Sequence, residues 1–129
     1  MKVVLEAVKA LLLTITGLST TTYTLYTFPD DKFVGVRIGF EGDAGTYTLN
    51  RTLGDVLPKM ILVFTARQLT VDSASNILYL IKQQLETRTQ VTQGSVVFNV
   101  FTPQGSVNVV GLDEGLYVAS LRVGVQYAV

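Results

Sequence analysis

The sequence contains no cysteine, no histidine and no tryptophan in its 129 residues. Without Cys and His, the chain cannot form a zinc finger, a thiol nucleophile, an imidazole base or a His-ligated metal centre. A Ser-His-Asp triad cannot be assembled from one such chain. Any catalysis would therefore depend on carboxylates, Lys or Tyr, and the sequence predicts no catalytic residue, no metal site and no cofactor.

Charge is scarce and balanced, with ten Lys and Arg against ten Asp and Glu, and only 16% of residues charged. The cations form no run or stripe, so we expect neither specific nucleic-acid binding nor attraction to an anionic membrane. Hydrophobic residues make up 48% of the chain, and a chain of this length buries roughly two-thirds of its surface on folding. The sequence therefore predicts one domain over residues 1–129, with a core that needs no disulfide or metal.

An apolar segment near the N-terminus predicts a helix over residues 2–17. One face carries apolar residues spaced three and four apart, namely Val4, Val8, Leu11, Ile15 and Leu18. Leu5, Leu12 and Leu13 fall outside this stripe. A helix with so much apolar surface is either deeply buried or packed against a neighbouring subunit. The apolar run is well short of the roughly 20 residues that span a membrane.

The next part of the chain predicts strands at 23–28 and 33–40, joined by a turn at Pro29–Lys32. Residues 41–58 contain three glycines and no sustained period, so we expect a long connection without regular structure. Such connections are uncommon in compact domains and usually have a function. Lys59–Arg67 is apolar on both faces, which is typical of a central strand.

The second half of the chain predicts a helix over 70–87 that begins near Thr70 or Asp72, because its apolar residues again recur at three and four. Strands are expected near 95–101, 106–111 and 116–127. The predicted order is helix, three strands, helix, three strands. This order is typical of an α+β domain, with a mostly antiparallel mixed sheet and two helices packed on one face.

Three acidic pairs could in principle bind Mg²⁺ or Ca²⁺. They are Asp30 with Asp31, Glu41 with Asp43, and Asp113 with Glu114. Each lies in a predicted turn, where such side chains bond the local backbone, so we interpret them as turn residues.

Two arginines, Arg37 and Arg122, lie beside glycines on predicted strands. They either pair with acids across an interface or stay solvated on an open face. The predicted strand edges have few charges, and an edge without Lys or Pro pairs readily with another chain. Together with the apolar first helix, these features indicate a self-assembling structural protein.

Several segments have a familiar order and spacing over nearly the whole chain. The apolar helix leads to Phe28-Pro29-Asp30-Asp31, to the strand at 33–40 and to a connection at Gly42–Gly45. Pro58–Arg67 leads into a helix holding Ala74 and Leu85, and Gly111–Tyr117 forms a turn into a final long strand. In this order the chain resembles the tail terminator proteins, also known as tail completion or minor capsid proteins, of long-tailed double-stranded DNA bacteriophages.

This resemblance implies a structural virion protein and not an enzyme. Members of the family form a ring, commonly a hexamer, on the head-proximal end of the tail tube, where they stop tube polymerisation and join the tail to the capsid neck. The implied partners are further copies of the chain, the tail tube protein and a neck or head-completion protein. DNA would pass through the lumen without specific binding. The implied location is the virion tail, after assembly in the host cytoplasm.

The 41–58 connection is the candidate contact segment, because it is long and polar in an otherwise compact pattern. The candidate interface residues are Arg37 on the preceding strand and, in the connection, Asp43, Tyr47, Asn50, Arg51 and Asp55. We expect the connection to reach the tube or a neighbouring subunit. One alternative is another head–tail joining or tail tube protein. A second is a small-molecule binding module, which would be a monomer with an internal apolar pocket.

Overall fold

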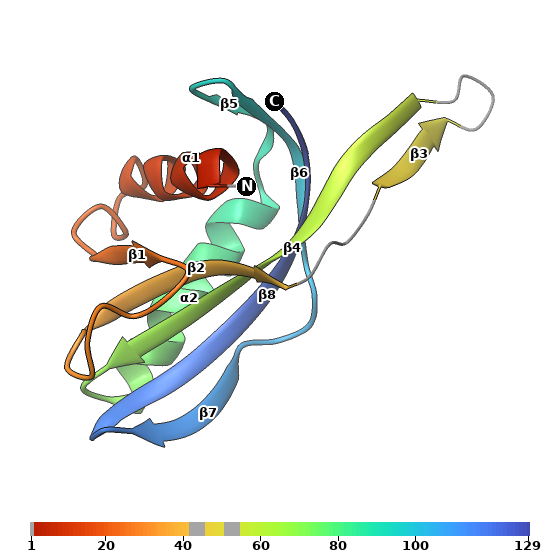
Figure 1. Cartoon of the computed structure of the whole chain (residues 1–129). Coiled ribbons are helices and arrows are strands. Elements are labelled where there is room, and N and C mark those ends of the chain that lie inside the picture. The colour runs from red at the N-terminus through yellow and green to blue at the C-terminus, as the bar shows by residue number, and fades with distance from the viewer. Residues whose placement is uncertain (1, 42–45, 51–54) are drawn as a thin grey trace.

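A computed structural model describes residues 2–41, 46–50 and 55–129 of the chain. It has an α+β fold, as expected, in which a curled sheet carries two helices on one face (Figure 1). The elements are α1 (Lys2–Leu13), β1 (Tyr23–Leu25), β2 (Gly35–Glu41), β3 (Thr46–Asn50), β4 (Asp55–Gln68), α2 (Val71–Glu86), β5 (Thr89–Gln93), β6 (Val96–Pro103), β7 (Asn108–Asp113) and β8 (Leu116–Ala128).

The sheet runs in the order β1-β2-β4-β8-β6-β5, with β3 paired to β4 and β7 paired to β8. The β1–β2 pair is parallel and the other pairs are antiparallel. β4 and β8 form the centre, in a register that runs from Lys59 opposite Gln126 to Gln68 opposite Tyr117. The central strand predicted from 59–67 is therefore confirmed, and it is longer than expected.

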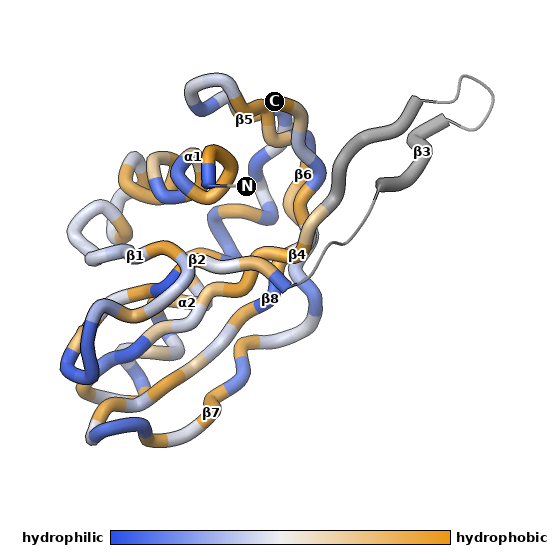
Figure 2. Tube along the Cα trace, viewed as in Figure 1, coloured by the Kyte–Doolittle hydropathy of each residue, from blue (hydrophilic) through white to orange (hydrophobic). Residues whose placement is uncertain are grey.

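The core lies between the inner face of the sheet and the two helices. Alternate residues of the central strands point into it, and α2 covers them with a stripe that is also buried. These residues are Met60, Leu62 and Phe64 of β4, Leu121, Val123 and Val125 of β8, and Ala74, Leu78, Ile81 and Leu85 of α2. In Figure 2, hydrophobic residues (orange) recur along α1 and along the central strands.

The first helix is buried by its own chain. Leu5 and Leu12, which lie outside the predicted stripe, are 0% exposed, because α1 packs against β1, β2, β5 and β6. This burial accounts for the extra apolar surface without a neighbouring subunit, and it leaves few large apolar side chains of α1 exposed, such as Val3 and Leu13. No helix in the described part of the chain is long and apolar enough to cross a membrane.

Both helices start within one residue of their predicted first residues, but α1 ends earlier than predicted. α1 ends at Leu13 and not at residue 17, because the Thr14 hydroxyl donates to the Leu11 carbonyl at 2.6 Å and the chain then turns. α2 begins after Thr70, whose hydroxyl accepts a hydrogen bond of 3.1 Å from the Ser73 amide. Thr70, one of the two residues expected near the start of this helix, is therefore its N-cap.

One strand after the second helix was not predicted. β5 lies directly after α2 and pairs with β6, so four strands and not three follow the second helix. Its sequence is TQVTQ, in which Val91 is the only apolar residue, and it packs against the core only in part. A polar edge strand of this kind has no hydrophobic alternation to reveal it.

Candidate functional site

The 41–58 segment contains a β-hairpin, so the prediction of a connection without regular structure is wrong. β3 pairs antiparallel with the first part of β4, which puts Thr46 opposite Pro58 and Tyr47 opposite Leu57. Thr, Tyr and Val occur in these segments and favour strands. The two segments therefore form strands by pairing with each other, although neither shows a strict alternation of apolar and polar residues.

The hairpin reaches beyond the rest of the sheet (Figure 1). β2 pairs with β4 only from Ile61 onward and β8 only from Lys59 onward. Among the described residues, the part of β4 from Asp55 to Pro58 pairs with β3 alone. The hairpin is thus an arm on the body of the molecule, and such an arm is well placed to contact another chain.

The arm carries three of the candidate interface residues. Tyr47 and Asn50 lie on β3, and Asp55 is the first residue of β4. The register brings Asn50 directly opposite Asp55 near the closed end of the hairpin. Asp43 and Arg51 lie outside the described residues. The structure therefore places three of the six candidates on one projecting element.

Arg37 lies apart from the arm, on the outer face of β2. It is half-buried, and its guanidinium donates to the Thr65 hydroxyl at 3.1 Å across to β4. Its guanidinium carbon is also 4.7 Å from the centre of the Phe28 ring. These contacts within the chain fix the direction of Arg37 and leave part of the side chain accessible.

Arg67, at the end of β4, is a buried arginine that sequence reasoning did not single out. It is only 2% exposed, and it donates to the backbone carbonyls of Asp30 and Asp31, the first at 3.1 Å. Its guanidinium carbon lies 4.7 Å from the centre of the Phe28 ring, and its Nε has no hydrogen-bond partner among the residues that the structure describes. The contacts attach the Pro29–Lys32 turn to the outer face of the sheet. The only signal in the sequence is an Arg that ends an apolar strand.

The second open-face arginine, Arg122, forms an ion pair with Glu41 of the same chain. The pair crosses the central strand diagonally, since Arg122 lies opposite Val63 and Glu41 opposite Ile61. Both side chains are about half exposed, so the pair adds little to stability. Glu41 is the last residue of β2, so its assignment to a turn is wrong, and its companion Asp43 lies outside the described residues.

The strand β7 exposes an apolar edge on the body of the molecule. Val109, Val110 and Leu112 are 51%, 68% and 65% exposed. β7 pairs with β8 on one side, and no other described strand pairs with its second side. An edge of this composition, with no Lys, Arg or Pro, is open to pairing with another chain.

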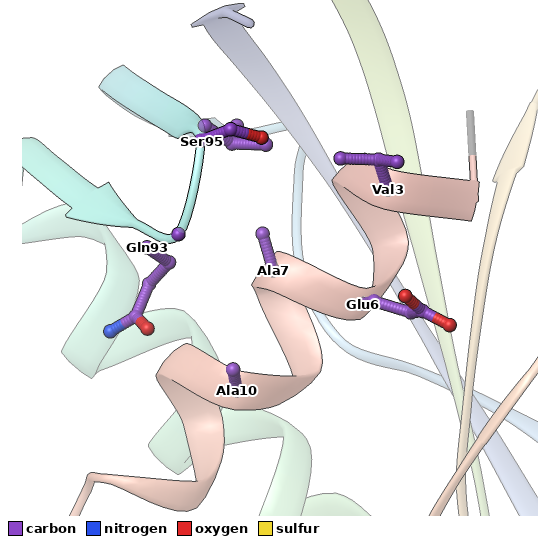
Figure 3. Close-up of a pocket in the computed structure, with 8 residues that line it drawn as sticks. Val3, Glu6, Ala7, Ala10, Gln93 and Ser95 are labelled. Carbon is purple, nitrogen blue, oxygen red and sulfur yellow. The ribbon is translucent and has the colours of Figure 1, made fainter.

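A shallow groove of about 270 Å³ runs between α1 and the turn that joins β5 to β6 (Figure 3). Val3, Ala7 and Ala10 line one wall, and Gln93 and Ser95 lie on the other. Glu6 is the single carboxylate in the lining, and it lies 3.8 Å from the Lys2 ammonium. One carboxylate supplies neither an acid–base pair nor a set of metal ligands.

Among the described residues there is no group of three or more His, Cys, Asp or Glu side chains that could hold a metal ion. Asp30 instead accepts a hydrogen bond of 2.8 Å from the Lys32 amide in its own turn. Asp113 and Glu114 lie at the turn between β7 and β8, where Glu114 has a φ of 52°.

No protein-family model matches the chain, and a search of curated proteins finds no match.

Proposed function

We propose that this protein is a structural virion protein that forms a ring on the head-proximal end of a phage tail tube. The ring ends tube polymerisation and joins the tail to the capsid neck. The observation that carries the proposal is the β3–β4 arm, which pairs with itself and reaches beyond the sheet. The order of motifs along the chain, from the N-terminal helix to the final long strand, supports the same function.

The physical mechanism is one head-to-tail contact that is repeated between successive copies of the chain. A contact between two different patches of the same chain generates a ring when the rotation between copies closes. The arm supplies one projecting patch, and the body supplies others. Zero net charge suits a lumen through which a polyanion must pass without being held.

The first test measures the mass of the purified protein by light scattering over a series of concentrations. We expect a closed particle of about 85 kDa, which is six chains of 14.1 kDa. Open-ended polymers would instead favour a tail tube protein. A monomer at every concentration would contradict self-assembly in the absence of the tube and would favour the small-molecule binding module.

The second test removes the arm. Deleting residues 44–52 takes out β3, while the β2–β4 and β4–β8 ladders stay in place. We expect circular dichroism and urea unfolding to show an intact fold. In co-assembly with the tail tube protein, electron microscopy should show tubes of uncontrolled length.

Tyr79→Ser, at an exposed position on α2 far along the chain from the arm, is the matched control. It should leave the length of the tubes unchanged. A folded deletion variant that still limits tube length would overturn the proposed role of the arm.

A further inference from the structure

Among the described strands, four border the sheet or its arm: β1, β3, β5 and β7. β1 is only three residues long, and β5 lies against α1. The edges of β3 and β7 remain, with five and six residues. A row of unpaired amide and carbonyl groups on such a strand is a template for another strand.

We propose that β7 of one copy pairs with β3 of the next copy, so that the sheet continues from subunit to subunit. This pairing rests on the self-assembly proposed above and names the surfaces that would join. Added strands of this kind gain affinity from main-chain hydrogen bonds and specificity from their side chains. The occupant of the β7 edge is therefore a second copy of this chain.

The two strands cannot pair within one molecule. Figure 1 shows β3 at the far end of the arm and β7 at the opposite end of the body. Any strand that pairs with either edge must therefore come from outside the molecule, and each copy supplies both edges. Two different edges joined in this way give a head-to-tail contact, which can close into a ring.

The composition of the two strands is compatible with direct pairing. β3 reads TYTLN and has no charged residue, and β7 reads NVVGLD with Asp113 as its single charge. No like charges would lie opposite one another in either direction of pairing. Side chains of the added strand would lie beside the exposed Val109, Val110 and Leu112 and cover part of their apolar surface, which favours association.

Disulfide cross-linking tests the pairing directly. The chain has no cysteine of its own, so any disulfide must join the introduced residues. Paired strands bring opposite Cα atoms to about 5 Å, which a disulfide can bridge. Thr48→Cys is combined in turn with Val109→Cys, Val110→Cys and Leu112→Cys, which covers neighbouring registers. After mild oxidation, we expect at least one double variant to form a ladder of linked chains on a non-reducing gel.

The single variants are the controls. Val110→Cys alone should give no linked dimer, and a dimer would instead indicate that β7 pairs with β7 of a second copy. Linked polymers without a closed particle of about 85 kDa would support the strand pairing and contradict the ring. A closed particle with no cross-link in any double variant would support the ring and overturn the pairing.

A second variant tests the same edge without cysteine. Val110→Lys with Leu112→Lys places two cations on the edge and should convert the assembled protein to monomer, with the midpoint of urea unfolding of the monomer unchanged. Leu69→Lys is the matched control, since Leu69 is 72% exposed but lies in the segment between β4 and α2. Full assembly of the double-lysine variant would overturn the proposal.

Discussion

The Arg67 guanidinium donates a hydrogen bond of 3.1 Å to the backbone carbonyl of Asp30, thirty-seven residues earlier in the chain. A cation that is almost completely buried thus holds a surface turn against the sheet. Its partners are two backbone carbonyls and an aromatic ring. Among the described residues, Arg67 therefore holds the turn by hydrogen bonds and ring contact, and not by an ion pair with a carboxylate. Arg suits this position because its planar fork can bond two carbonyls at once.

Replacing Arg67 by Ala should destabilise the protein. The change removes two hydrogen bonds, the contact with Phe28 and buried side-chain volume, for an expected loss of about 3 kcal/mol in the free energy of unfolding. Arg37→Ala is the matched control, because Arg37 contacts the same ring but is half-buried and, among the described residues, its side chain makes one hydrogen bond. It should cost about 1 kcal/mol. Urea unfolding measures both, and an equal or greater loss for Arg37→Ala would contradict this account.

Two glycines of β2 give a second pair of variants. A Cβ at Gly35 would lie 2.3 Å from the Thr22 carbonyl oxygen and 2.8 Å from the Phe33 ring, whereas a Cβ at Gly39 would meet no atom of the described residues within 4 Å. Gly35→Ala should therefore cost about 2–3 kcal/mol. Gly39→Ala should change stability by less than about 0.5 kcal/mol. Similar unfolding midpoints for the two variants would show that Gly35 is not closely packed.

Tyr23 should make stability depend on pH in the alkaline range. Its hydroxyl donates to the Leu18 carbonyl at 2.9 Å, and burial raises the pKa of Tyr23 to about 12. The unfolded chain has a tyrosine pKa of about 10. Because the folded value is higher, the contribution of Tyr23 is fully present below about pH 10 and is lost as the pH rises toward about 12.

The matched variant is Tyr23→Phe, which cannot ionise. It should be less stable near neutral pH by about 1 kcal/mol, because it lacks the hydrogen bond. Between about pH 10 and pH 12, its unfolding midpoint should fall less steeply than that of the parent protein. Parallel pH profiles would contradict the assignment of this loss to Tyr23.

The sequence predicts those helices and strands in which the spacing of apolar residues matches the faces that become buried. The apolar run at 59–67 predicts a central strand because both of its faces are largely covered, and the stripe from Ala74 to Leu85 predicts α2 because one face meets the sheet. β5 shows no such pattern, since it is a polar edge strand. The α+β class is therefore predictable from the sequence, while the number of strands is not.

The candidate site depends on which segments pair with each other. The order of residues within one segment does not contain this information. Tyr47, Asn50 and Asp55 were chosen for their polarity in an expected loop, and the structure places them on a hairpin because β3 and β4 bond to each other. The role of Arg67 depends on a turn more than thirty residues away. The exposed edge of β7 also depends on the strand order, since the same residues would be covered in the middle of the sheet.

The central β4–β8 ladder has a consequence for how fast the protein folds. Gln68 pairs with Tyr117 and Lys59 with Gln126, so the partners are 49 to 67 positions apart. The loop between them must close before the core gains any burial, and proteins with such distant pairings fold over roughly milliseconds to seconds. During that time core residues such as Phe64 and Leu121 are exposed in addition to the apolar edge of β7, so slow folding at high concentration favours aggregation over native assembly.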